Sequence, residues 1–236
     1  RMSRRFGHLG GVKELLLPPP LPSRSHRHGA SLHQNILSSK WFLDTDCYVN
    51  DQYVMHDGTG GEVVLQEKYF PATGTRAKIR KIHLLLPGPG LAFKLDNDQV
   101  ELQRKKSKPP LFHFLDDTAK PWSKRCDFVI FYVNRRTFHA DCIEFKSKSL
   151  SADKIVPQLK AGTSWVNSLM RTIEHYTGDK HSIRLRKFVF AENENPGPYI
   201  DGNRQLKADP SIRYYHFDEV QGQSLAHLHN TSVQGI

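Results

Sequence analysis

The stretch Cys126–Lys148, CDFVIFYVNRRTFHADCIEFKSK, decides the fold. Two runs rich in β-branched and aromatic residues flank a short polar and basic segment, and this pattern predicts an antiparallel hairpin. With the turn at Asn134–Thr137, Val133 pairs with Phe138, and each further pair lies one residue outward on both strands. The register of the whole hairpin follows from that one assignment.

Continued outward, the register sets Asp127 directly opposite Glu144. Opposed side chains have Cβ atoms about 5 Å apart, so two like charges there repel each other. Strand side chains alternate between faces, so Lys146 shares the face of Glu144. Two opposed carboxylates favour a cation between them, and oxygen ligands suit Mg²⁺, whose coordination is completed by water and substrate phosphate. These residues are therefore the candidate metal site.

Asp127 together with Glu144-Phe145-Lys146 resembles the motif of the PD-(D/E)xK nuclease superfamily, whose fold is restriction-endonuclease-like. The resemblance implies that Asp127, Glu144 and the backbone carbonyl of Phe145 bind Mg²⁺, for which Mn²⁺ can substitute. It implies that Lys146 orients or activates the attacking water. The chain departs from the motif at Cys126, where the superfamily pattern has Pro.

The segment that follows the hairpin, residues 151–178, repeats apolar residues close to every 3.6 positions and predicts an amphipathic helix. Ser151 or Asp153 can cap its start, and Gly178 suits its end. Pro157 leaves two alternatives, a helix that begins just before it or a kink.

Gln158 lies early in this helix. In some branches of the superfamily a Gln at this place borders the site, so the resemblance implies an assisting catalytic role. The alternative is an ordinary polar residue of a first helical turn. Ser182–Ala191 and residues 211–217 predict further strands. The order strand, strand, helix, strand matches the central unit of the superfamily, whereas the polar tail from Gly222 onward is expected to fray.

Upstream of the hairpin, residues 62–104 have the alternation and turn residues of a β meander. Residues 31–43 predict a short amphipathic helix. The superfamily fold usually opens with such a helix, which sometimes carries an extra acidic ligand, but this one has no acid. The candidates for that ligand are Asp44 and Asp46 just beyond it, and Glu62 and Glu67 in the meander.

Two clusters of basic residues lie in this upstream region. The formal net charge of +10 over 236 residues favours a polyanionic partner, although ordinary basic surfaces are common. We expect the clusters to contact nucleic-acid phosphates. They comprise Lys78, Arg80 and Lys81, and then Arg104, Lys105, Lys106 and Lys108.

These patterns predict an α/β protein with a restriction-endonuclease-like central mixed sheet flanked by helices. Residues 1–60 are interpreted as a basic, Pro-containing N-terminal arm and short helix, and 61–236 as the β meander plus a nuclease core at about 111–218. The 3 cysteines include no CxxC pair, which favours a reduced, cytoplasmic compartment. No apolar run approaches the roughly 20 residues that span a membrane.

The function that follows is metal-dependent hydrolysis of phosphodiester bonds. The resemblance implies a DNA endonuclease, with DNA favoured over RNA, acting in antiviral defence or in repair and recombination. No base-reading helix or RNA-recognition motif is evident, so a partner protein or a homo-oligomer would supply specificity. The alternative is a non-catalytic nucleic-acid-binding or scaffold subunit that retains the nuclease fold. A nuclease built on histidines finds no supporting pattern.

Overall fold

Two β-sheets and one long helix make up the part of the chain that this computed structural model describes. The described residues are 54–58, 60–69, 76–96, 124–147, 149–178 and 180–234, all within one unit, Ser31–Ile236. In chain order the elements are β1 (Val54–Gly58), β2 (Gly61–Tyr69), β3 (Lys78–Leu86), β4 (Gly90–Lys94), β5 (Phe128–Asn134), β6 (Thr137–Lys146), α3 (Ala152–Thr177), β7 (Ile183–Ala191), β8 (Gln205–Leu206), β9 (Asp209–His216), α4 (Phe217–Val220), β10 (Gln223–Ser224) and β11 (Val233–Gln234).

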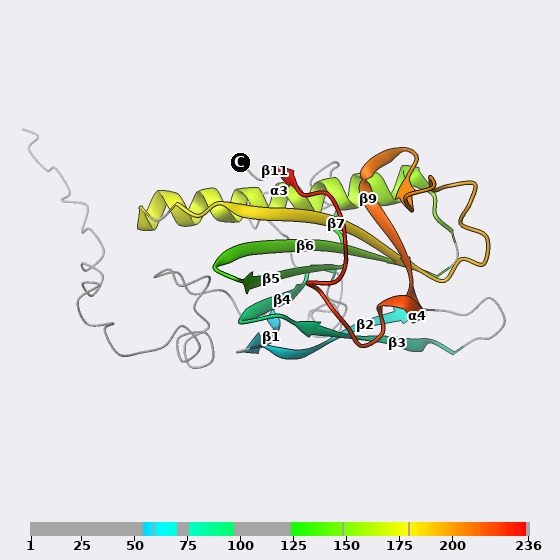
Figure 1. Ribbon diagram of the computed structural model, residues 1–236, viewed down its shortest axis with the longest axis horizontal. Helices are drawn as coiled ribbons and strands as arrows, with labels where there is room; N and C mark the ends of the chain where they lie inside the picture. The colour runs from blue at the N-terminus through cyan, green and yellow to red at the C-terminus, as the bar shows by residue number, and fades with distance from the viewer. Residues whose placement is uncertain are drawn as a thin grey trace, which may run out of the picture. The chain divides into compact units, whose positions relative to one another are not determined.

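The larger sheet is mixed, with the strand order β1-β4-β5-β6-β7-β9-β8 and with β11 paired to β7. The β5–β6 hairpin is antiparallel, whereas β6, β7 and β9 run parallel. A parallel pair needs a crossover connection, and α3 supplies it between β6 and β7 (Figure 1). The predicted α/β class with a central mixed sheet is therefore confirmed.

The β5–β6 hairpin has the register predicted from the sequence, with Val133 opposite Phe138 and Asn134 opposite Thr137. Its two turn residues, Arg135 and Arg136, have positive φ angles of 47° and 68°. Two-residue hairpin loops favour such left-handed pairs because their twist matches that of the strands, and Asn-Gly usually supplies them. Here two arginines adopt this conformation, so the flanking strands impose the turn.

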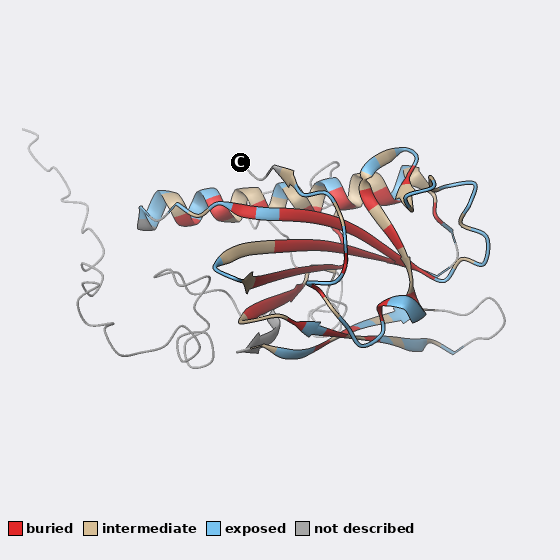
Figure 2. Cartoon of the chain, in the orientation of Figure 1, coloured by how far each residue is buried: buried red, intermediate tan, exposed pale blue. Residues whose placement is uncertain are grey.

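The helix α3 covers one face of the larger sheet (Figure 1). Its apolar stripe includes Ile155, Leu159, Val166 and Ile173, which pack against side chains from β4–β7 and β9. The other face is covered by the smaller sheet, of order β10-β3-β2, and by α4. Figure 2 shows β5, β6 and β7 buried over most of their length. Covered on both faces, β5 is an almost continuous apolar run, whereas β6 and β7 also bury the charged residues Asp141, Glu144, Arg186 and Lys187.

The helix α3 begins at Ala152 and runs through Pro157 without ending there. Ser151 occupies the N-cap position but its side chain makes no capping hydrogen bond. The helix therefore does not begin just before Pro157. Gly178 terminates it in the left-handed conformation, φ 71°, with its N–H donating to the Glu174 carbonyl, as the predicted stop requires.

Gly162 lets α3 approach the hairpin closely. A Cβ at this position would overlap Cys126 Sγ and come within 3.4 Å of Cys142 Sγ. Both cysteines are free and buried, and the well-packed core around them leaves little space to move. The close crossing holds the N-terminal half of α3, including Gln158, over the end of the hairpin.

Gly162→Ala is therefore expected to destabilise the protein by about 1–3 kcal/mol, the usual cost of overpacking a core. This cost exceeds the helix propensity gained, which is about 1 kcal/mol. The exposed Ser164, two residues further along α3, provides the control, because Ser164→Ala should change stability only slightly. Urea denaturation measures both. A Gly162→Ala protein as stable as the wild type would contradict this packing.

The region read as a β meander divides between the two sheets. β2 and β3 pair antiparallel in the smaller sheet, whereas β4 pairs with β1 and β5 in the larger one. β1 lies inside the segment 1–60 that was interpreted as an arm with a short helix, and it belongs to the larger sheet. The uninterrupted meander was therefore wrong, because strand alternation does not reveal which strands become partners.

The C-terminal tail does not fray, contrary to expectation. β10 pairs with β3, β11 pairs with β7, and Leu225 and Leu228 are buried. Arg186 donates hydrogen bonds to the carbonyls of both leucines and pairs with the buried Asp141. This buried guanidinium anchors the tail, which composition alone does not reveal. Among the described residues, no helix is long and apolar enough to cross a membrane.

Candidate functional site

The two predicted carboxylates come together at the open end of the hairpin. The pairing of β5 and β6 reaches Phe128 opposite Ile143, and the next step sets Asp127 opposite Glu144. Only 5% of Asp127 and 1% of Glu144 is exposed. Asp127 Oδ2 accepts a hydrogen bond of 2.6 Å from the Phe145 backbone N–H. The motif residues are therefore joined by the backbone as well as by register.

Lys146 and Gln158 complete this group. Lys146 Nζ pairs with Glu144 Oε1 and donates a 3.0 Å hydrogen bond to Gln158 Oε1. Gln158 lies in the second turn of α3, so this hydrogen bond connects the helix to Lys146 at the end of β6. This contact places Gln158 beside Lys146, and its assisting role stays a prediction.

Burial raises the pKa of the Asp127 carboxyl well above its usual range, and the neighbouring charges of Glu144 and Glu67 raise it further. The Phe145 N–H and Lys146 oppose this shift. Burial likewise raises the pKa of Glu144 to about 7, against the opposing effect of Lys146. Removal from water thus destabilises both anions, and the Glu144 charge adds to this effect at Asp127.

This raised pKa makes stability depend on pH. The folded protein binds the Glu144 proton more tightly than the unfolded chain, so the stabilisation is present below pH 4.5 and is lost as the pH rises through about 7. The loss is up to about 3 kcal/mol for a shift of this size. In EDTA, Glu144→Gln should therefore lose less stability than the wild type between about pH 5 and pH 8. Urea denaturation at several pH values measures this, and parallel profiles would contradict it.

The residues fit a divalent cation in one specific respect. Among the described residues, Glu144 Oε2 is buried without a hydrogen-bond partner, which is a costly state for a carboxylate oxygen. A hard cation bound there would satisfy this oxygen and relieve the repulsion by Asp127. Within the described ranges no group of three or more His, Cys, Asp or Glu side chains is arranged to hold a metal. A site here would thus use two carboxylates, a carbonyl and water.

Of the candidates for an additional acidic ligand, Glu67 is near the pair. Its charge raises the pKa of Asp127, and its carboxylate lies 3.5 Å from Lys94 Nζ. Glu62 instead lies 2.9 Å from His83 Nδ1. Asp44 and Asp46 lie outside the described residues, as does the predicted helix 31–43.

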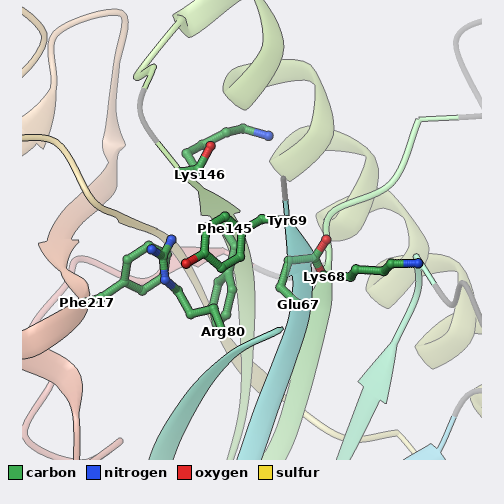
Figure 3. Close-up of a pocket in the computed structure, with 8 residues that line it drawn as sticks. Glu67, Lys68, Tyr69, Arg80, Phe145, Lys146 and Phe217 are labelled. Atoms are coloured by element: carbon green, nitrogen blue, oxygen red, sulfur yellow. The ribbon is translucent and has the colours of Figure 1, made fainter. Parts of the chain in front are cut away.

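A pocket of about 330 Å³ opens beside the motif, at the end of β6. Figure 3 shows Lys146 above it, Phe217 and Arg80 on one side, and Glu67 and Lys68 on the other. Asp127 and Glu144 do not line it. The sequence did not reveal this pocket, because its walls come from segments far apart in the chain. The full lining is Glu67, Lys68, Tyr69, Arg80, Phe145, Lys146, Ser147 and Phe217.

The first basic cluster does not form one surface. Lys78 and Lys81 are exposed, but Arg80 alternates with Lys81 across the strand and faces inward. The Arg80 side chain is 13% exposed and pairs with Glu192. Its guanidinium also stacks on Tyr69 and Phe217. Arg80 therefore does not share an open surface with Lys81, and phosphate contact by these residues stays a prediction. The second cluster, Arg104, Lys105, Lys106 and Lys108, lies outside the described residues.

Comparisons of this chain with protein-family models, with curated proteins and with solved structures found no match.

Proposed function

We propose that this protein is a metal-dependent nuclease that hydrolyses phosphodiester bonds at Asp127, Glu144 and Lys146, on a restriction-endonuclease-like core. The observation that carries the proposal is the buried pair of opposed carboxylates, with one Glu144 oxygen lacking a hydrogen-bond partner among the described residues. An arrangement this costly is typical of functional sites. The resemblance to the PD-(D/E)xK motif supports the same reading.

In this proposal Asp127, Glu144 and the Phe145 carbonyl would hold Mg²⁺ or Mn²⁺, which supplies charge stabilisation at the scissile phosphate and a more acidic bound water. Lys146 positions the attacking water and adds positive charge beside the phosphate. Gln158 keeps the lysine amino group in place through its 3.0 Å hydrogen bond. Burial under α3 excludes bulk water from the carboxylates, which strengthens their interaction with a cation.

DNA is the favoured substrate, because the superfamily that the motif resembles mostly cuts DNA. The net charge of +10 supports a polyanionic partner of either kind. A partner protein or a second copy of the chain would supply sequence specificity. The resemblance to the superfamily favours antiviral defence as the biological setting. Repair or recombination is the alternative setting.

One observation favours the alternative, a non-catalytic nucleic-acid-binding or scaffold subunit. Lys146 Nζ already pairs with Glu144, so a lysine cation can compensate one carboxylate without any metal. In such a subunit the basic residues would bind phosphates, and the buried carboxylates would serve only the fold.

A panel of substrates separates the two functions. Plasmid, linear duplex, single-stranded DNA and RNA are each incubated with the protein in Mg²⁺, Mn²⁺ or EDTA. The nuclease proposal predicts cleavage of at least one DNA substrate with metal and none with EDTA. Binding without cleavage in every metal would favour the scaffold subunit.

A further inference from the structure

The pocket beside the motif is lined by three aromatic rings, of which Phe145 and Phe217 contact each other and Tyr69 contacts Arg80. The Phe145 and Phe217 rings meet edge to face with centroids 5.1 Å apart. The Arg80 guanidinium lies 4.5 Å from the Tyr69 centroid and 4.2 Å from that of Phe217. Phe145 and Phe217 are buried, and Arg80 is further held by Glu192. The wall is thus preorganised, and an entering ligand would not have to order it.

The polar groups of this pocket suit a ligand with both a phosphate and a hydrogen-bonding edge. Lys68 is exposed at one side, and Lys146 lines the top (Figure 3). The Lys68 ammonium can neutralise phosphate, whereas the Lys146 ammonium is held by Glu144 and Gln158. Glu67 contributes carboxylate oxygens, which accept hydrogen bonds from exocyclic amines such as that of cytosine. The volume of about 330 Å³ is at the lower end of small-ligand pockets, which suits one nucleotide and excludes a duplex.

The pocket is coupled to the candidate active site through the backbone. Phe145 donates its N–H to Asp127 Oδ2 while its ring forms part of the pocket. Lys146 pairs with Glu144 on one face of the sheet, and the pocket lies at the end of the same strand. The Phe145 ring lies on the opposite face of β6 from Glu144, so a strand whose scissile phosphate lies at Glu144 would pass round the end of β6 to place a neighbouring nucleotide in this pocket.

We propose that this pocket accepts one unstacked nucleotide of the substrate strand, next to the scissile phosphate, so that the enzyme acts on single-stranded or frayed DNA in preference to continuous duplex. This inference rests on the proposed nuclease function, because it takes the bound strand to be the strand that is cleaved. A base inside a duplex has both faces covered by its neighbours, and an aromatic wall can receive only a base that has left the stack. Tyr69 is half-buried, whereas Phe145 and Phe217 are buried.

The test measures binding in EDTA, where cleavage does not occur, by fluorescence anisotropy of a labelled single strand and of its duplex. The variants are Tyr69→Leu, which removes the ring, and Lys68→Gln, which removes an exposed charge. The matched control is Tyr176→Leu, because Tyr176 is 76% exposed near the far end of α3. Thermal melting checks that each variant is folded.

We expect wild type to prefer the single strand and Tyr69→Leu to bind it about tenfold more weakly, as removal of a stacking aromatic typically does. Lys68→Gln should weaken single-strand binding and reduce its salt dependence. If Tyr69→Leu does not fold, this second variant still tests the proposal. The control should bind as the wild type does. A labelled single-stranded RNA of the same sequence shows whether the pocket discriminates the sugar.

Two different failures can be told apart. In the first failure, the wild type cleaves no substrate, and Tyr69→Leu or Lys68→Gln still loses affinity for the single strand. The nuclease proposal then fails and the nucleotide pocket stands. If the wild type cleaves DNA with metal but binds single strand and duplex alike, and the variants bind as tightly as the control, the pocket proposal is overturned and the nuclease stands.

Discussion

Glu144→Gln is expected to lower the rate of Mg²⁺-dependent cleavage by at least about 100-fold, since an active-site group of this kind contributes about 10²–10⁴-fold. The amide keeps the size and the capacity to accept the Lys146 hydrogen bond, but it removes the charge that would bind the cation. Lys146→Ala is expected to have an effect of similar size, because it deletes the group that positions the attacking water. Cleavage of a labelled DNA strand, with metal in excess, measures both.

The matched controls are Glu174→Gln and Lys180→Ala, whose side chains form a pair, 3.6 Å apart, at the far end of α3. Both controls should cleave at the wild-type rate. Folding is checked by circular dichroism, and Glu144→Gln is expected to be at least as stable as the wild type near neutral pH, because it no longer buries a charge. Folded Glu144→Gln and Lys146→Ala proteins that cut at the wild-type rate would show that the site lies elsewhere.

Mg²⁺ is expected to raise the melting temperature by about 5–10 °C when its concentration is about 100 times the dissociation constant. A ligand that binds only the folded state contributes about 2.7 kcal/mol at that excess, and each kcal/mol shifts the midpoint of a protein of this length by about 2–4 °C. The cation also stabilises the folded state because it relieves the repulsion between Asp127 and Glu144.

Asp127→Asn should raise the melting temperature in EDTA and reduce the further increase on adding Mg²⁺. Its amide oxygen can still accept a hydrogen bond from the Phe145 N–H, so we expect the local structure to be retained. Asp218→Asn is the control, because the Asp218 side chain is 94% exposed, and it should respond to Mg²⁺ as the wild type does. An equal response of Asp127→Asn would locate the bound cation at another place.

The hairpin and its helix could be predicted because their signals are local. A polar turn between two β-rich runs fixed the partner of Val133, and strand alternation then brought Lys146 to the face of Glu144. The apolar period of residues 151–178 determined which helix face meets the sheet. The hydrogen bond between Lys146 and Gln158 is a finding of the structure. Each step needed only neighbours in sequence or one pairing rule.

What could not be predicted depends on partners far apart in the chain. Arg80 read as part of a basic cluster, yet its partner is Glu192, which follows a different strand. The polar tail read as frayed, yet Arg186 binds two of its carbonyls and draws Leu225 and Leu228 into the core. Composition describes how polar a segment is, but it does not show which buried charged group forms hydrogen bonds with the backbone of that segment.

The most direct test of the account is a calorimetric titration of Mn²⁺, and then of Mg²⁺, into the wild type and into the double variant Asp127→Asn, Glu144→Gln. The account predicts saturable binding to the wild type at metal concentrations of about millimolar or below, typical of sites with few carboxylates, and loss of that binding in the folded double variant. A wild-type protein that binds no divalent cation in this range, or a double variant that binds it equally well, would contradict the assignment of Asp127 and Glu144 as a metal centre.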